Sequence, residues 1–375
     1  MSAATTARIA KVETFIASYA VHGHFKFFLT ADGQPFRRET VLVKITDDTG
    51  HNGWGQSVPS PTWSYETIDT VRSTIDRHLA PALVGLDAFD TARIWRVMNR
   101  TIAPSFSTGQ PIAKAGIDLA LFDLTGRVLG QSAHERWQSH PPRPVTLSWT
   151  LDPRGLDDVA AGIAEAHARG FRHFNVKVGA DAAFDLDVCR EIRRHAPEAF
   201  VWVDANGGYT LEAALAAAPK FADLGIAALE QPLAANRLPG YRELTRQGAL
   251  PILMDEGVVT LTDLESFHQL GLLNGVAMKV SRSGGLTEAR RIVEYLRQNG
   301  LHFFASGLTD PDLAFAACLL LFSACDLPHP AALNAPQFLQ GSFLKTPLGI
   351  AGDQAAPPTG TGLGVEIDET LLHPG

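Results

Sequence analysis

The sequence lacks the features of a disulfide-rich, membrane-spanning or nucleic-acid-binding protein. Its three cysteines, Cys189, Cys318 and Cys325, form no C-x-x-C pair, and no disulfide framework is expected. The longest nearly apolar run, residues 313–325, is shorter than the ~20 residues that a membrane span needs. No block of lysine or arginine occurs and the net charge is −8, which argues against nucleic acid and anionic membranes as partners.

The beginning of the chain and its length narrow the class further. The first residues, MSAATTARIAKVETF, contain no apolar stretch of the kind that signal peptides carry, so a cytoplasmic protein is expected. A chain of 375 residues is too long for one ordinary domain and suits a barrel of roughly 200–250 residues plus a second domain. The 45% apolar content is enough for a large core.

Five ionisable residues at nearly constant spacing indicate the fold. They lie 27, 26, 25 and 24 residues apart, and each ends a short apolar run: Lys177 in FNVK, Asp204 in FVWVD, Glu230 in IAALE, Asp255 in PILMD and Lys279 in VAMK. A strand, a loop and a helix together occupy about that length, so the spacing predicts successive βα units of a parallel barrel. Catalytic groups in such barrels lie at the C-terminal ends of the strands.

The predicted fold class is therefore α/β: a (β/α) barrel of the TIM type with an N-terminal α+β capping domain that the C-terminal tail completes. Capping-domain strands are expected at residues 8–20 and 39–46, and helices at residues 65–79, 88–98 and 111–129. Barrel strands one, two, seven and eight are expected at residues 145–150, 173–178, 302–306 and near 331–335. The predicted domains are residues 1–130 for the cap, 131–336 for the barrel and 337–375 for a tail that packs back on the cap.

Three of the spaced residues predict a metal site. Asp204, Glu230 and Asp255 would present oxygen ligands at neighbouring strand ends. Mg²⁺ favours such ligands, whereas zinc prefers His or Cys, which the adjoining motifs VDANGGY, EQP and MDEG do not contain. The alternative, that these acids are solvated loop residues or helix caps, is disfavoured by the shared register of all three.

The two lysines predict acid/base chemistry at that metal. Lys177 and Lys279 end the second and sixth expected barrel strands, on opposite sides of the acids. A lysine becomes a useful base when burial or nearby positive charge lowers its pKa. With a substrate carboxylate on Mg²⁺, one lysine can remove the α-proton while the other acts on the opposite face or on a leaving group. Alternatively, the lysines only neutralise the acids in a structural salt-bridge cluster.

The motifs around these residues resemble a known family. NVKVG, VDANGGY, LEQP, MDEG and MKVSRSGG are similar to those of the enolase superfamily, in its muconate-lactonizing branch, and AGIDLALFDLTGRVLG resembles the helix that precedes the barrel there. The resemblance implies that Asp204, Glu230 and Asp255 bind Mg²⁺. It also implies that Lys177 and Lys279 form the acid/base pair.

Two positions depart from the pattern of the branch. Asn175 replaces the first lysine of the usual Lys-x-Lys, which removes a positive neighbour and should leave the pKa of Lys177 less depressed. Asn334 lies in a segment where dipeptide epimerases carry Asp-x-Asp, so binding of a dipeptide ammonium is not expected. The segments SGLTDPD and ALNAPQFL instead resemble the cis-3-hydroxy-L-proline dehydratases of this branch.

Substrate contacts are expected from N-terminal loops and from the remaining strand ends. By resemblance, loops at residues 22–27 and 56–65 close over the barrel mouth, and their aromatic residues suit a water-excluding lid. Asp310 either caps the next helix or pairs with a substrate amine, and Trp149 lies either in the pocket or in the core. The candidate substrate-binding residues are Lys26, Phe27, Gln56, Trp149, Ser306, Gly307, Asp310 and Asn334.

The sequence therefore predicts a Mg²⁺-dependent lyase that acts on a small amino or imino carboxylate. It would abstract the α-proton and eliminate a β-hydroxyl as water, and the resemblance favours cis-3-hydroxy-L-proline as the substrate. An amino-acid or proline-analogue racemase or epimerase would use the same lysines and is the main alternative. A non-catalytic metal-binding barrel is a weaker one. A homo-oligomer is expected.

Overall fold

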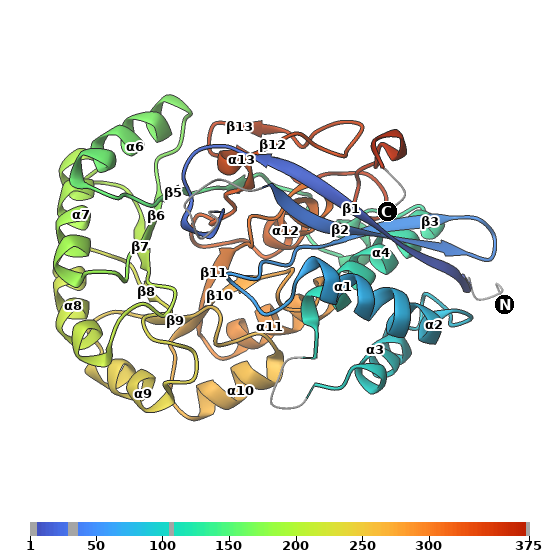
Figure 1. Ribbon diagram of the computed structural model, residues 1–375, viewed down its shortest axis with the longest axis horizontal. Coiled ribbons are helices and arrows are strands. Elements are labelled where there is room, and N and C mark those ends of the chain that lie inside the picture. Colours follow the sequence, from blue (N-terminus) through green and yellow to red (C-terminus); the bar gives the residue numbers. More distant parts are fainter. Residues whose placement is uncertain (1–5, 29–36, 105–108, 373–375) are drawn as a thin grey trace.

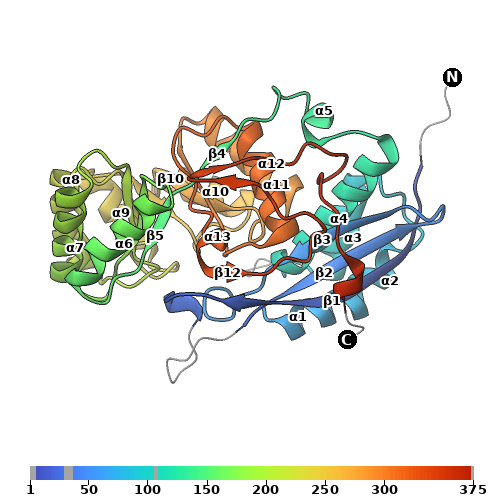
Figure 2. The same ribbon diagram turned by 90° about the horizontal axis from the view of Figure 1, so that it is seen from above.

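The antiparallel sheet of the N-terminal part lies beside a curled parallel sheet (Figure 1). The computed structural model describes residues 6–28, 37–104 and 109–372. Seen from above, the N-terminal strands run along one side of the molecule, and the C-terminal segments return to them (Figure 2).

Seven parallel strands form the curled sheet, in the order β11-β10-β9-β8-β7-β6-β5. The strands are β5 (Trp149–Leu151), β6 (Phe174–Lys177), β7 (Val201–Asp204), β8 (Leu229–Glu230), β9 (Ile252–Met254), β10 (Gly275–Lys279) and β11 (His302–Ser306). The helices are α6 (Leu156–Ala168), α7 (Ala182–His195), α8 (Leu211–Asp223), α9 (Leu238–Gln247), α10 (Leu261–Gln269), α11 (Leu286–Gln298) and α12 (Asp312–Ala324). Helices α6 to α10 form an outer arc around the strands (Figure 1). The expected barrel architecture is confirmed.

A short segment closes the gap between β11 and the start of the barrel. Ala332 forms a parallel bridge with Ser306, and Ala331 forms one with Leu147. The expected eighth strand is only this bridging segment, because helix α13 (Ala335–Phe338) begins within it. The expected first strand is also divided, since β4 (Val145–Thr146) pairs with β14 (Gln354–Ala355) of the C-terminal tail.

Alternation along the strands decides which side chains enter the barrel. Phe174 and Val176 of β6 pack with the surrounding helices, so Asn175 and Lys177 face the interior. A separate apolar cluster fills the interior, formed by Trp202, Ala228, Leu253, Ala277, Phe304 and Ala332. Four of the charged strand ends lie two residues beyond members of this cluster, so the site rests on a packed apolar floor.

The N-terminal sheet packs closely on helix α4 (Pro111–Leu129) through glycines. Its strands are β1 (Ile9–Val21), β2 (Arg38–Asp47) and β3 (Asn52–Ser57). A Cβ on Gly55 would lie only 2.0 Å from the carbonyl oxygen of Gly116, so this approach requires glycine. The sequence did not predict β3, because Gly53 and Gly55 interrupt the alternation that marks a strand.

Two of the N-terminal helices begin later than their hydrophobic pattern indicated: α3 begins at Thr91 instead of residue 88, and the helix expected from residue 65 also starts later. The expected helix at residues 65–79 begins at Ile68, because Thr67 and Thr70 form a capping box there. The remaining helical elements are α1 (Ile68–Thr74), a π-helical turn (Ile75–Leu79), α2 (Ala80–Leu83), α3 (Thr91–Thr101), α5 (Ala133–Trp137) and a 3-10 turn (Lys26–Phe28).

The C-terminal tail contacts both parts of the molecule. β12 (Leu339–Gln340) pairs with β1, and β13 (Ile350–Ala351) continues the small sheet of β14 and β4. Near the end, a 3-10 turn (Glu369–Leu371) places Glu369 2.7 Å from Lys44 of β2. The tail thus joins the capping sheet to the first barrel strand, while the expected domain limits stay predictions.

Helix α12 contains the most apolar run of the chain and lies against the N-terminal sheet. The backbone N–H of Ala314 donates to Gln56 of β3 over 3.1 Å, and nearly every side chain of the helix is buried. This burial accounts for its apolar composition. Among the described residues, no helix combines the length and the hydropathy that crossing a membrane requires.

Candidate active site

The five spaced residues converge at the C-terminal ends of strands β6 to β10. Parallel register places Lys177 opposite Asp204 and Asp204 opposite Glu230. Carboxylate oxygens of Asp204, Glu230 and Asp255 all lie within 4.8 Å of one another, and all five side chains are buried. The spacing in the sequence therefore becomes one compact cluster, here called the charged centre.

Each lysine forms an ion pair with a different carboxylate. Lys177 Nζ lies 2.5 Å from Asp204 Oδ2, and Lys279 Nζ lies 2.5 Å from Asp255 Oδ1. Lys279 Nζ is also 3.7 Å from Glu230 Oε1. The guanidinium of Arg282 donates to Asp255 as well. Three cations thus face three acids, which offsets much of the penalty for burying the charges.

The electrostatics differ from one carboxyl group to the next. Burial, together with the nearby charge of Asp204, raises the pKa of Glu230 to about 8. Burial also disfavours the charge of Asp204, but the neighbouring lysines outweigh it and lower its pKa. For Lys177 burial opposes the charge, yet the surrounding carboxylates outweigh burial and raise its pKa. A cation bound between the acids would counter the burial and the charge repulsion that raise the pKa of Glu230.

The three acids fit a Mg²⁺ ion by their donor set and by two oxygens that lack a hydrogen bond. Glu230 Oε1 and Asp255 Oδ2 are buried and accept no hydrogen bond from any described residue. A buried acceptor without a partner costs about 1–3 kcal/mol, and a divalent cation would satisfy both oxygens. With Asp204 they supply only hard oxygen ligands, which Mg²⁺ prefers.

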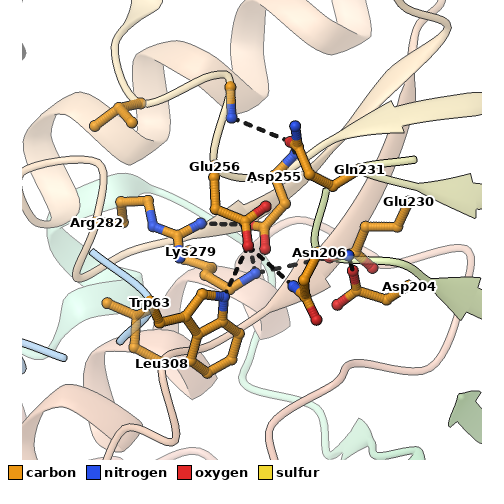
Figure 3. A network of polar contacts seen from close by, with 12 residues as sticks. Trp63, Asp204, Asn206, Glu230, Gln231, Asp255, Glu256, Lys279, Arg282 and Leu308 are labelled. Atoms are coloured by element: carbon orange, nitrogen blue, oxygen red, sulfur yellow. Dashed lines mark hydrogen bonds and ion pairs between the residues drawn. The ribbon is translucent and has the colours of Figure 1, made fainter. Parts of the chain in front are cut away.

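Trp63 of the N-terminal domain covers the charged centre (Figure 3). Its indole Nε1 donates to Glu256 Oε1 over 3.0 Å, and Asn206 Nδ2 donates to the same oxygen over 2.9 Å. The centre of the indole ring lies 5.4 Å from Lys177 Nζ and 5.3 Å from Lys279 Nζ, within range of a cation–π interaction. The loop at residues 56–65 thus reaches the charged centre through Trp63.

The other N-terminal loop lies beside Trp63. The ring of Phe27 stacks on Trp63 with the centroids 4.2 Å apart. Burial and the charge of Lys177 lower the pKa of Lys26, and the Lys26 backbone N–H donates to Asp152 Oδ2 over 2.8 Å. The structure therefore brings Lys26 and Phe27 to the barrel mouth, and their contact with substrate stays a prediction.

Gln56 does not lie at the barrel mouth, so its prediction is wrong. It belongs to β3 and is fully buried. Its amide Nε2 donates to Tyr19 and to Thr40, and its Oε1 accepts from the backbone of Ala314. Gln56 therefore joins the N-terminal sheet to α12 instead of contacting a substrate.

Trp149 faces the helix layer instead of the pocket, so its prediction as a substrate-binding residue is also wrong. Its ring packs against Phe171 with the centroids 5.1 Å apart, and the guanidinium of Arg169 lies 4.9 Å from its ring centre. The signal was present in the sequence: Leu147, Trp149 and Leu151 share one face of the segment and belong to the outer core.

Asp310 also departs from its predicted roles, whereas the substrate contact of the neighbouring Gly307 stays a prediction. Asp310 is buried and accepts hydrogen bonds from Ser281 Oγ over 2.6 Å and from the Leu308 backbone over 2.9 Å, so it is not a free partner for an amine. It does not cap α12 either, since the N-cap is Pro311. A Cβ on Gly307 would lie 2.5 Å from Asp310 Oδ2, so this glycine makes room for that carboxylate.

Ser306 and Asn334 lie on the interior side of the barrel. Ser306 pairs in register with Lys279 and follows the interior residue Phe304 by two positions. Asn334 Nδ2 donates to Thr150 Oγ1 over 3.2 Å. Both side chains are placed where substrate contact is feasible, and that contact stays a prediction.

Two family models match successive parts of the chain. The model described as mandelate racemase / muconate lactonizing enzyme, N-terminal domain, matches residues 12–135, and the model described as enolase C-terminal domain-like matches residues 158–371. The second model alone covers more than half of the chain. The chain belongs to the enolase superfamily. Within it, the chain belongs to the mandelate racemase and muconate lactonizing branch, as the motifs indicated.

Relatives across this branch match the chain over most of its length. A chloromuconate cycloisomerase of Cupriavidus necator is 29% identical over 90% of this chain and 91% of its own. An N-succinylamino acid racemase of Amycolatopsis sp. is 28% identical over 92% of both chains. The muconate lactonizing enzyme of Pseudomonas fluorescens, complexed with muconolactone, superposes with a TM-score of 0.88 at 25% identity, covering 97% of this chain and 98% of that one. The protein is thus an enzyme of the enolase superfamily.

Sequence reasoning missed four side chains of this enolase-superfamily site. Asn206, Glu256 and Arg282 lie within the quoted motifs VDANGGY, MDEG and MKVSRSGG. Their polar character beside the spaced residues is the signal that would have found them. Trp63 lies in the loop at residues 56–65 expected to close over the barrel mouth, but its own contact with the charged centre depends on how the two domains pack.

Proposed function

We propose that this enzyme abstracts the α-proton of a small amino or imino carboxylate with the help of Mg²⁺ and eliminates a β-hydroxyl as water. The observation that carries the proposal is the pair of buried lysines, Lys177 and Lys279, that flank a centre of three carboxylates. The proposed substrate is cis-3-hydroxy-L-proline, with Δ1-pyrroline-2-carboxylate as the product. The likeness of SGLTDPD and ALNAPQFL to the corresponding dehydratases supports this choice.

Each group of residues has a separate role, set by its position at the barrel mouth. Asp204, Glu230 and Asp255 would hold the ion, which when bound supplies positive charge for the substrate carboxylate and for the enediolate derived from it. Lys177 and Lys279 approach from β6 and β10, so one can take the α-proton while the other protonates the leaving group. The aromatic lid at Trp63 excludes water from the reacting groups.

A racemase or epimerase is the second candidate. It would use the same lysines, one to remove the α-proton and the other to return a proton to the opposite face. The N-succinylamino acid racemase, 28% identical to this chain, supports this candidate. A non-catalytic metal-binding barrel is less well supported, because both lysines and all three acids are present at the charged centre.

The test follows substrate protons by NMR in D₂O with Mg²⁺ present. The panel contains β-hydroxy amino and imino acids, the same acids without the hydroxyl, and muconate, because cycloisomerases are among the relatives. A keto- or imine-level product indicates elimination, whereas deuterated starting material of both configurations indicates racemisation. Glu230→Gln should lower either rate about 10²- to 10³-fold, since it weakens stabilisation of the developing charge.

The proposal would be contradicted by a protein that neither eliminates nor exchanges any member of the panel, or by full activity after chelation of metal. Lactonisation of muconate without exchange at an α-carbon would instead assign it to the cycloisomerases. Homo-oligomeric assembly and a cytoplasmic location stay predictions.

A further inference from the structure

Next to Lys177, the barrel interior carries three neutral polar side chains in a row. Thr150 of β5 pairs in register with Asn175 of β6, and Asn334 of the closing segment donates to Thr150 Oγ1 over 3.2 Å. Asn175 precedes Lys177 by two residues and shares its face of β6. We call Thr150, Asn175 and Asn334 the neutral row.

The neutral row adjoins the charged centre. Asn175 pairs in register with Trp202, and the indole Nε1 of Trp202 donates to Glu230 Oε2 over 2.8 Å. By register, Asn175 lies at the level of Trp202 in the interior layer directly beneath the charged centre, so a substrate held by the triad would rest on the row. The row thus belongs to the same cavity end of the barrel as the two lysines.

Two atoms of the neutral row lack the hydrogen bonds that their burial calls for. Asn175 Nδ2 and Asn334 Oδ1 are buried, and neither has a hydrogen-bond partner among the described residues. The residues are only 2% and 5% exposed. Buried amide groups nearly always have partners, because an unmade bond is unfavourable in a site that water does not reach. Each of these two atoms therefore calls for a partner that the described residues do not supply.

One of the two atoms donates and the other accepts, which restricts what the group is. A hydroxyl can accept from Asn175 Nδ2 and donate to Asn334 Oδ1. A carboxylate would direct lone pairs at Asn334 Oδ1, and an ammonium would direct a donor at Asn175 Nδ2. The row itself carries no charge to neutralise either ion, and the neighbouring Lys177 ammonium already pairs with Asp204. A neutral hydroxyl fits best.

We propose that the neutral row binds the β-hydroxyl that leaves the substrate, with Lys177 as its acid and Lys279 as the base for the α-proton. This assignment rests on the proposed elimination. A hydroxyl held by Asn175 lies beside the Lys177 ammonium, because both side chains project from the same face of β6. Lys279 reaches the charged centre from β10, on the other side of the triad.

The step balances without any further reactant. Lys279, as the neutral amine, takes the α-proton, and the electrons of the C–H bond pass into the enediolate. Its collapse forms the Cα–Cβ double bond and breaks the Cβ–O bond. The oxygen leaves with the electron pair of the Cβ–O bond, receives a proton from the Lys177 ammonium and departs as water. The enamine that remains tautomerises to the imine Δ1-pyrroline-2-carboxylate, as its N–H proton is lost and Cβ gains one. Asn175 and Asn334 act as positioning residues that orient the departing oxygen toward Lys177.

The experiment tests each asparagine variant on substrates with and without the β-hydroxyl. Asn175→Leu and Asn334→Leu remove the amide at similar volume, and the Ala variants give the same comparison if a Leu variant does not fold. Each is assayed for elimination of a β-hydroxy acid and for α-proton exchange of the same acid without its hydroxyl. We expect elimination to fall about 10- to 100-fold in kcat/KM and exchange to change less than about threefold.

Asn274→Ala is the matched control at the opposite end of the barrel. Its Oδ1 already accepts from the Ile252 backbone N–H over 2.9 Å, so its loss should lower Tm and leave the ratio of the two rates unchanged. An equal fall of both rates in the neutral-row variants, with a lower Tm, would mean that the row holds a structural water and would overturn the assignment. Unchanged elimination would overturn it as well.

Failure of the proposed function is visible in the unaltered enzyme, before any variant is compared. An enzyme that exchanges α-protons but never eliminates the hydroxyl is a racemase, and both proposals then fail. An enzyme that eliminates normally, with asparagine variants that eliminate equally well, retains the proposed function and loses only the assignment of the neutral row.

Discussion

The two sides of the barrel mouth differ in how their polar groups are satisfied. On the side of β7 to β10, the three acids are paired with lysines and with Arg282, and the two oxygens left without a hydrogen bond, Glu230 Oε1 and Asp255 Oδ2, are ones that a cation would satisfy. On the side of β5, β6 and the closing segment, the groups are neutral, and Asn175 Nδ2 and Asn334 Oδ1 have no described partner. The two sides therefore have different roles. The charged side can act on any α-proton beside a carboxylate, whereas the neutral side selects a substrate whose hydroxyl supplies the missing hydrogen bonds.

Lys177 stands at the border between the two sides. Its ammonium pairs with Asp204 of the charged centre. Asn175 of the neutral row lies two residues earlier in the same strand, β6. A group that both contributes to the charged centre and contacts the neutral row is well placed to link proton transfer to the identity of the leaving group. The following experiments test whether the two sides are separable.

Removal of metal should have the largest effect and should act on the charged side alone. Treatment with EDTA should abolish turnover, and Mg²⁺ should restore it. The fold should survive, because Lys177 and Lys279 already pair with Asp204 and Asp255. Circular dichroism before and after chelation, with turnover measured in parallel, checks both points. Unfolding on chelation would show that the ion is structural, and undiminished turnover would remove it from the mechanism.

Replacement of the lysines should separate the two proton transfers. Lys279→Ala should lose α-proton exchange and elimination, each by about 10²- to 10⁴-fold. Lys177→Ala should lose elimination by a similar factor while it still exchanges the α-proton of one enantiomer in D₂O. Lys177→Arg is the matched control, because it keeps the positive charge beside Asp204 but cannot transfer a proton at working pH. If both Ala variants eliminate at the normal rate, neither lysine is involved.

Binding of Mg²⁺ should depend on pH through Glu230. Burial and Asp204 raise the pKa of Glu230 to about 8, so below that pH the free protein holds a proton that the ion must displace. The apparent affinity should therefore rise about tenfold per pH unit up to about pH 8 and flatten above it. Calorimetry in two buffers of different ionisation enthalpy should detect release of about one proton at pH 7. An affinity that is constant from pH 6 to 8 would contradict this electrostatic account.

Loss of the indole donor of Trp63 should have the smallest effect. Trp63→Phe retains an aromatic ring to stack on Phe27 but removes the 3.0 Å hydrogen bond to Glu256. One such bond contributes about 1 kcal/mol, so KM should rise about three- to tenfold with kcat little changed. Trp137→Phe, in a tryptophan that contacts Arg290 far from the charged centre, is the control. A fall in kcat with an unchanged KM would mean that Trp63 serves the chemical step instead of closure.

Features that depend on residues close together in the sequence were predicted more accurately than features that depend on residues far apart. Helix α4 and strand β11 occur at the residues expected, because local periodicity and flanking signals define them. The position of Trp149 was predicted wrongly, although the sequence contained the necessary signal: alternation along the segment places it with Leu147 and Leu151 in the outer core. The burial of Gln56 could not be predicted from the sequence, since strand β3 depends on glycines that permit close contact with α4.

The sequence by itself determined the charged centre, because a βα unit has a nearly fixed length and parallel register brings successive strand ends to one edge. Tertiary structure alone decided what surrounds it. Trp63 meets Glu256 across 193 residues of sequence, and Asn334 meets Thr150 across 184. Such contacts carry no local period, because they arise from domain packing and from closure of the barrel. The contact of Trp63 with Glu256 and the neutral row therefore became visible only in the folded chain, although the resemblance already indicated the lid loops.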